Sequence, residues 1–239
     1  LCSFVSTDIS SRFSILPAVS GTFDGSGTGS PRRIFTFLWF FMPNHSLLFL
    51  HVPKTAGTTF RGILNRVYNE DQTHELYGNI PKAIADFKAL PEGQRQQITC
   101  LRGHVPFGLH VHLPGNVTYV TFLRDPVERV ISHYYYVRRT PEHRLHDAIV
   151  NDGVTLRGYV DLDGELRNGQ SRMIAACPDT SDPDAVYEKA WNNLTSYFPV
   201  VGITERFDLS LALMVTKLNW PNVYYRKRNV SRKRPGKKE

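Results

Sequence analysis

The sequence predicts an α/β fold in which a central, mainly parallel β-sheet is flanked by helices. Two apolar runs, residues 47–50 and 117–123, suit strands that are covered on both faces. Each run ends in a polar loop, and apolar residues at helical spacing follow. Strands that alternate with helices form a parallel sheet, whose ligand lies outside the carboxyl ends of the strands. The loops at Lys54, His104 and Arg124 are therefore expected to converge.

The loop after the first strand has the composition of a phosphate-binding site. Pro53 ends the strand, because it has no N–H to give to a ladder, and apolar residues at helical spacing follow from Phe60. An anion at this helix N-terminus would meet unsatisfied N–H groups, hydroxyls and one ammonium group. The loop is not a Walker P-loop, since Lys54 precedes Gly57 instead of following it. The alternative is an ordinary strand–turn–helix unit with a Thr cap.

The alternation continues along the chain. Residues 97–101 predict a second strand that runs into Arg102, Gly103 and His104, and Pro126 suits the first turn of a helix that extends to Arg138. The run from Tyr134 to Tyr136 is expected to pack within that helix and not to bind a sugar. Further helices are expected at 81–90, 155–160, 166–176, 184–197 and 207–218, and strands at 199–203 and 223–225. The helical segment between 140 and 198 would cover the sheet and shape a cleft for a second substrate.

Bulk composition indicates one globular domain with an anionic partner. The chain has 239 residues, of which 41% are hydrophobic, enough to bury one core. The formal net charge of +7 favours a nucleotide, a nucleic acid or an acidic polysaccharide, and charge alone does not choose among them.

Two motifs, HVPKTAGTTF and TFLRDPVERVISHYYYVRR, resemble the paired nucleotide-binding motifs of sulfotransferases that use 3′-phosphoadenosine 5′-phosphosulfate (PAPS). Together with RGHV they are similar to the heparan sulfate 2-O-sulfotransferase branch of the carbohydrate sulfotransferases, over about residues 47–235. The resemblance implies a P-loop-NTPase-like three-layer fold. It also implies transfer of the sulfuryl group from PAPS to a hydroxyl of a carbohydrate acceptor by in-line displacement, with no metal required and with 3′,5′-ADP as product.

The resemblance assigns the donor site to both motifs and to the C-terminal segment. Arg124 and Ser132 would bind the 3′-phosphate, and the alternative role of Arg124 is a salt bridge to Asp125 or Glu128. The residues expected to hold the 5′-phosphosulfate are Lys54, Thr55, Ala56, Gly57, Thr58 and Thr59, and those expected near the 3′-phosphate or adenine from the segment NVSRKRP are Ser231 and Arg234.

His104 is the catalytic base that the resemblance implies. A hydroxyl acceptor loses its proton as it attacks sulfur, and an imidazole with a near-neutral pKa can take it. Lys54 would stabilise the leaving phosphate, and His51 is the alternative base. The related branch has a second His two residues before the base, where this chain has Arg102. The candidate acceptor contacts are Arg102, Gln170 and Arg172.

Two other functions fit parts of the sequence. A P-loop-like nucleotide kinase would need a carboxylate that holds Mg²⁺, for which Asp125 is the candidate. A non-enzymatic polyanion-binding protein would use the basic tail at 236–239. The pair His110 and His112 suggests zinc, but no fourth ligand has suitable spacing, so no metal site is expected. No nucleic-acid partner is expected either.

The compartment is predicted from the termini, the cysteines and the sequons. Residues 1–41 are expected to be a disordered leader or an upstream extension, followed by a sulfotransferase domain over 42–235. Three widely spaced cysteines favour a reducing compartment, so the expected localisation is cytoplasmic. The apolar run 34–42 is short for a membrane span, yet with four N-x-[ST] matches it keeps open the alternative of a Golgi-luminal enzyme with a signal anchor.

Overall fold

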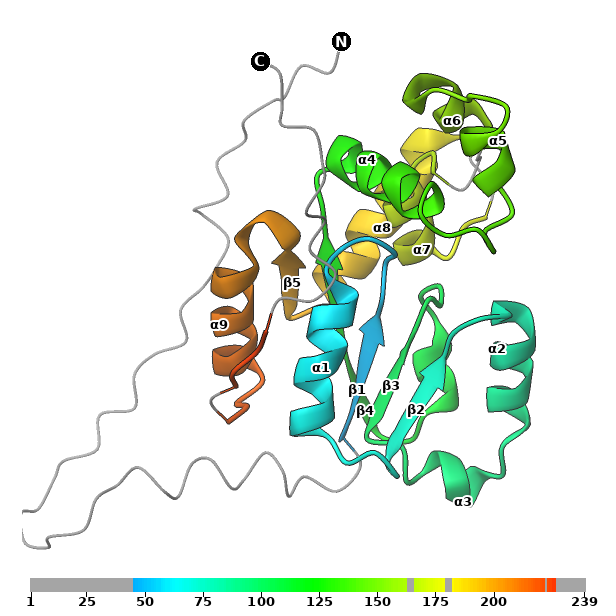
Figure 1. The fold of residues 1–239 in the computed structure, drawn as a ribbon. Coiled ribbons are helices and arrows are strands. Elements are labelled where there is room, and N and C mark those ends of the chain that lie inside the picture. The colour runs from blue at the N-terminus through cyan, green and yellow to red at the C-terminus, as the bar shows by residue number, and fades with distance from the viewer. Residues whose placement is uncertain (1–44, 163–165, 179–181, 222, 227–239) are drawn as a thin grey trace, which may run out of the picture. The chain divides into compact units, whose positions relative to one another are not determined.

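A five-stranded parallel sheet organises the chain in the computed structural model, which describes residues 45–162, 166–178, 182–221 and 223–226. The strands follow the spatial order β2 (Thr73–Leu76), β3 (Cys100–Gly103), β1 (His45–Leu50), β4 (Asn116–Leu123) and β5 (Val200–Ile203), and every neighbouring pair is parallel (Figure 1). The predicted α/β fold is therefore confirmed. Because β1 lies between β3 and β4, the loops that leave these three strands are neighbours.

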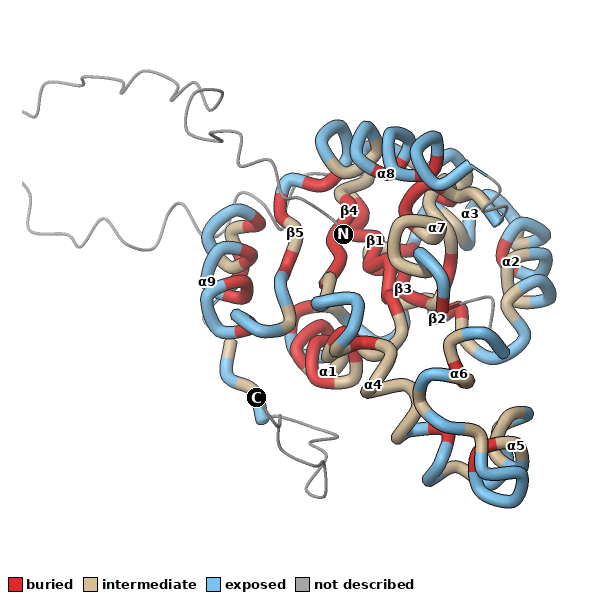
Figure 2. The backbone as a smooth tube through the Cα atoms, turned by 90° about the horizontal axis from the view of Figure 1, so that it is seen from above, coloured by how far each residue is buried: buried red, intermediate tan, exposed pale blue. Residues whose placement is uncertain are grey.

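The helices form layers on the two faces of the sheet. Leu48 and Leu50 belong to a core cluster with α2 (Ile80–Ala89), α7 (Gly169–Ala175) and α8 (Pro183–Tyr197), whereas Leu47 and Phe49 belong to a cluster with α1 (Gly57–Val67) and α9 (Phe207–Lys217). This alternation follows from the two-residue period of a strand. Figure 2 shows the buried strands between the two sets of helices. The three-layer arrangement expected from the resemblance is thus present.

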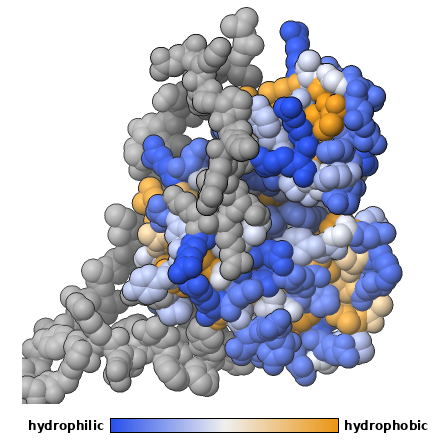
Figure 3. All heavy atoms as spheres, viewed as in Figure 1, coloured by the Kyte–Doolittle hydropathy of each residue, from blue (hydrophilic) through white to orange (hydrophobic). Residues whose placement is uncertain are grey.

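A smaller core lies beyond the carboxyl ends of the strands. It joins α4 (Pro126–Val137), α5 (His146–Val150) and α6 (Leu156–Leu162) through Val137, Ile149 and Tyr159, all buried. Figure 3 shows apolar residues gathered over this region, where Val150 and Leu162 are exposed. These helices therefore stand over the edge of the sheet where a ligand is expected.

Several element predictions need correction. The strand expected at 223–225 does not form, because Val223 and Tyr225 pack as irregular chain against the α1–α9 core. The edge strand β2, the helix α5 and the short helix α3 (Glu92–Arg95) had not been predicted. Only Leu76 is buried in β2, so this strand lacks the apolar pattern from which strands are recognised.

Other predictions fall on residues outside the described ranges. These are the leader at 1–41, the basic tail at 236–239, and the donor contacts Ser231 and Arg234. Within the ranges that are described, no helix has the length and apolar character that crossing a bilayer requires.

Leu48 should be essential to stability, because its side chain is fully buried in β1. Leu48→Ala is expected to lower the free energy of unfolding by about 2–5 kcal/mol, measured by urea denaturation. The matched control is Leu209→Ala on the outer face of α9, where the residue is 56% exposed and a change within about 0.5 kcal/mol is expected. Equal losses in both variants would contradict the described packing.

Candidate active site

The loop between β1 and α1 makes its turn with two non-glycine residues in the left-handed region. Lys54 has a φ of 70° and Ala56 a φ of 63°. The buried Thr55 donates its hydroxyl to the Val52 carbonyl at 2.8 Å, which holds the turn closed. Such backbone conformations are costly and cluster at ligand sites. The residue before α1 is Ala56, without a side-chain cap, so the alternative of a Thr-capped helix is wrong.

The start of α1 has no side-chain cap, and the Thr59 N–H donates to the Ala56 carbonyl at 3.0 Å. Gly57, Thr58 and Thr59 form its first turn, with Thr59 buried. The orphan N–H groups of a helix N-terminus and its positive dipole end favour phosphate and sulfate groups. This loop, which also contains Lys54, stays the candidate phosphate-binding loop.

His51 directly follows β1 and lies against the start of α1. A Cβ atom on Gly57 would fall 1.7 Å from His51 Nε2, so position 57 requires glycine for packing. His51 Nδ1 shares a hydrogen bond of 3.0 Å with the Tyr77 hydroxyl. Burial, followed by the charges of His104, Arg61 and Lys54, lowers the pKa of His51 to about 2. His51 is therefore a neutral, packed side chain.

His104 follows β3 and contacts His51, with ring centroids 4.3 Å apart. Its Nδ1 atom lies 2.8 Å from the His51 carbonyl oxygen. Because a carbonyl only accepts, Nδ1 carries the proton, and Nε2 keeps its lone pair in the neutral ring. Burial lowers the pKa of His104, with smaller contributions from Arg61 and Lys54, against the raising effect of the His51 hydrogen bond. His104 is thus held in the form that can accept a proton.

A charged network lies behind the histidines. Arg102 is 5% exposed and donates to Glu75 from Nε at 2.8 Å. Glu75 also pairs with Arg61 at 3.0 Å, and the Arg61 guanidinium covers the Tyr77 ring at 4.6 Å. The structure therefore does not bring Arg102 to the exposed part of the site. Glu75 and Tyr77 had not been predicted as part of the site, because β2 gave no strand signal.

Lys54 reaches across to α4. Its Nζ atom lies 4.1 Å from the centroid of the Tyr136 ring. Burial, followed by the charges of Arg139 and Arg124, lowers the pKa of Lys54 to about 8. The expectation that the tyrosine run packs within the helix holds for Tyr134, whose hydroxyl donates to the Val154 carbonyl at 3.1 Å. Tyr136 on the same helix contacts Lys54 instead, a contact that the sequence pattern does not predict.

Arg124 follows β4 and links the second motif to the first. Its NH1 group donates to the Lys54 carbonyl at 3.2 Å. Its charge is shared between Glu128 at 3.6 Å and Glu205 at 3.5 Å, so the ion pair considered with Glu128 is present. Asp125 instead caps α4, accepting from the Glu128 N–H at 2.9 Å. The three loops at Lys54, His104 and Arg124 converge as predicted.

The remaining predicted residues lie on the helices around these loops. Gln170 on α7 forms two hydrogen bonds with the Arg124 backbone, at 3.0 and 2.8 Å, and so fixes this loop. Arg172 on the same helix donates to the Pro178 carbonyl. Ser132 lies partly buried on α4, and His110 shares a hydrogen bond of 3.0 Å with the Tyr119 hydroxyl.

Comparison with known proteins identifies similar chains. The model of the sulfotransferase family matches residues 39–194. Heparan sulfate 2-O-sulfotransferase hst-2 of Caenorhabditis elegans is 26% identical over 191 residues, which cover 70% of this chain and 58% of that protein. Human heparan sulfate 2-O-sulfotransferase 1 is 23% identical over 194 residues, which cover 72% of this chain and 54% of that protein. The chain thus spans about half the length of the curated relatives it matches.

Among solved structures, mouse sulfotransferase SULT7A1 complexed with PAP is similar with a TM-score of 0.42 and 13% identity. The match covers 75% of this chain and 60% of that chain.

The buried neutral state of His51 should make stability depend on pH. In the folded chain its pKa is about 2, so below the ordinary value of 6.5 the unfolded chain binds one more proton there. This share of the free energy of unfolding should fall by about 1.4 kcal/mol for each pH unit between pH 6 and 4. Urea denaturation of His51→Gln should show a shallower pH dependence than the unaltered chain. Identical dependences would mean that His51 titrates normally in the folded state.

Proposed function

The chain belongs to the sulfotransferase family, and from this premise we propose that it transfers the sulfuryl group of PAPS to a hydroxyl group of a carbohydrate acceptor. The observation that carries the proposal is the convergence of Lys54, His104 and Arg124 from three neighbouring loops. A carbohydrate acceptor is supported by the similar proteins, which are heparan sulfate 2-O-sulfotransferases.

The phosphates of the donor fit two cationic positions. The Lys54 ammonium, the first N–H groups of α1 and the hydroxyls of Thr58 and Thr59 would hold the 5′-phosphosulfate. Arg124, with Ser132 on the helix that follows, would hold the 3′-phosphate. In the structure, Arg124 contacts Glu128 and Glu205 only at 3.5–3.6 Å. These ion pairs are longer than charge-assisted hydrogen bonds, so a phosphate could replace them.

In the proposed reaction, His104 removes the proton. Its Nε2 atom takes the proton of the acceptor hydroxyl while the hydroxyl oxygen forms a bond to sulfur. The bond between sulfur and the bridging oxygen of the 5′-phosphate breaks, and its electron pair stays on that oxygen. Lys54 stabilises the charge that develops there. The His51 carbonyl, which accepts from His104 Nδ1–H at 2.8 Å, stabilises the imidazolium that forms.

The geometry favours sulfuryl transfer over a nucleotide kinase. The carboxylate considered for Mg²⁺, Asp125, accepts the N–H of Glu128 and so serves as the cap of α4. Turnover in the presence of a metal chelator would separate the two activities, since a kinase of this type depends on Mg²⁺.

Removing the base should stop transfer without loss of the nucleotide. His104→Ala is expected to lower the rate of sulfate incorporation from PAPS by roughly 10²–10⁴-fold. Calorimetric affinity for 3′,5′-ADP should stay nearly unchanged, because no donor contact is assigned to His104. His112→Ala, on the 3₁₀ turn Leu109–His112, is the control and should keep its turnover. Unchanged turnover in His104→Ala would exclude this residue as the base.

Arg124 should determine recognition of the 3′-phosphate. The unaltered chain is expected to bind 3′,5′-ADP more tightly than 5′-AMP, and Arg124→Ala should reduce this preference by roughly 10–100-fold, as loss of a hydrogen bond to a charged group implies. Its affinity for 5′-AMP should fall less than its affinity for 3′,5′-ADP, because Arg124 also donates to the Lys54 carbonyl. Arg167→Ala, which removes an exposed guanidinium paired with Asp161, is the control. An undiminished preference in Arg124→Ala would place the 3′-phosphate elsewhere.

A further inference from the structure

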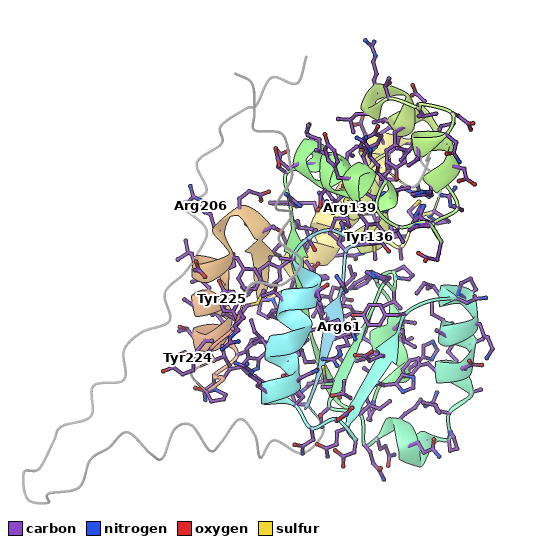
Figure 4. All side chains as sticks on the ribbon, in the orientation of Figure 1. Arg61, Tyr136, Arg139, Arg206, Tyr224 and Tyr225 are labelled. Atoms are coloured by element: carbon purple, nitrogen blue, oxygen red, sulfur yellow. The ribbon has the colours of Figure 1, made fainter. Side chains whose placement is uncertain are left out.

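Tyr136 contacts the ammonium group of Lys54 through the face of its ring. The distance from Nζ to the ring centroid is 4.1 Å, well within the range of about 6 Å over which a cation is attracted to an aromatic face. Figure 4 shows Tyr136 and Arg139 at the C-terminal end of α4, near the loop that follows β1. The contact therefore joins the end of α4 to the phosphate-binding loop.

Lys54 otherwise lies among groups that disfavour its charge. Arg124 faces it from the loop after β4, and Arg139 from the end of α4. The imidazoles of His51 and His104, which are neutral, face it from the loops after β1 and β3 and supply no negative charge. The acidic side chains Glu128 and Glu205 are bound to Arg124. Burial, followed by the charges of Arg139 and Arg124, lowers the pKa of Lys54 to about 8, close to the pH at which an enzyme would work.

We propose that Tyr136 is a positioning residue for Lys54, whose ammonium its ring face holds in the charged form beside the phosphate-binding loop. The ring attracts the cation through its quadrupole and carries no formal charge. A carboxylate in this place would bind the lysine more strongly, but it would also repel an anionic donor and compete with it. Tyr136 keeps the ammonium charged and available.

The backbone and the side chain of Lys54 are thus both held by the unit formed by β4 and α4. Arg124, after β4, donates to the Lys54 carbonyl at 3.2 Å, and Tyr136, on α4, receives the ammonium. This arrangement also restrains the left-handed backbone of Lys54, with a φ of 70°. Its consequence for catalysis rests on the proposed function, whereas its consequence for the protonation of Lys54 does not.

The test compares aromatic and aliphatic side chains at position 136, next to the Lys54 ammonium. The pH dependence of the acetylation rate of Lys54, followed by mass spectrometry of the peptide that contains it, reports its pKa. In Tyr136→Phe this pKa should stay within roughly 0.2 of that in the unaltered chain, whereas in Tyr136→Leu it should fall by roughly half to one pH unit. Tyr187→Leu is the control, because Tyr187 is 57% exposed on α8 and stacks on Trp191.

A lower pKa of Lys54 in Tyr136→Leu than in Tyr136→Phe supports the proposal, and an equal or higher pKa overturns it. Tyr136→Met is a second aliphatic variant, to be used if Tyr136→Leu does not fold. If the unaltered chain transfers sulfate from PAPS, the alkaline limb of kcat/KM should move to lower pH in the aliphatic variants alone. Absence of transfer by the unaltered chain would contradict the proposed function, while the acetylation result would still decide the role of Tyr136.

Discussion

The parallel pairing of β1 with both β3 and β4 is the constraint on which the site depends. Leu50 lies opposite Gly103 on one side and Thr121 on the other, so the three strands end at nearly the same level. The residues that follow them, around His51, His104 and Arg124, are therefore neighbours although they are far apart in the chain. The fit is close at the strand ends, since a Cβ atom on Gly103 would lie 2.1 Å from the Leu76 carbonyl oxygen.

The same surroundings give His104 and Lys54 different protonation states. Burial and the neighbouring cations lower the pKa values of both, which leaves the imidazole neutral and the ammonium charged over the range between their two pKa values. One group can then take a proton while the other stabilises negative charge, the separation of roles that acid–base catalysis requires. The hydrogen bond from His104 Nδ1–H to the His51 carbonyl fixes the tautomer, so the lone pair that can accept a proton is on Nε2.

The parts of the fold and site that sequence patterns predict are those that short segments encode. An apolar run before Lys54 and another before Arg124 predict β1 and β4, and the rule for parallel sheets brings their loops together. The contacts that could not be predicted depend on which strands pair and on how the helices pack. Tyr77 contacts His51 only because the polar strand β2 joins the sheet, and Glu205 reaches Arg124 from the turn after β5. The contact of Tyr136 with Lys54 likewise depends on the angle at which α4 leaves β4, which no local pattern specifies.

The most direct measurement of the central claim is a crystal structure of the chain with 3′,5′-ADP bound. The expected result has the 5′-phosphate at the first turn of α1 within hydrogen-bond distance of Lys54, and the 3′-phosphate on Arg124 in place of Glu128 and Glu205. His104 Nε2 should face the open side of the 5′-phosphate, where an acceptor hydroxyl would enter. A nucleotide bound away from these loops, or a 3′-phosphate without contact to Arg124, would contradict the account.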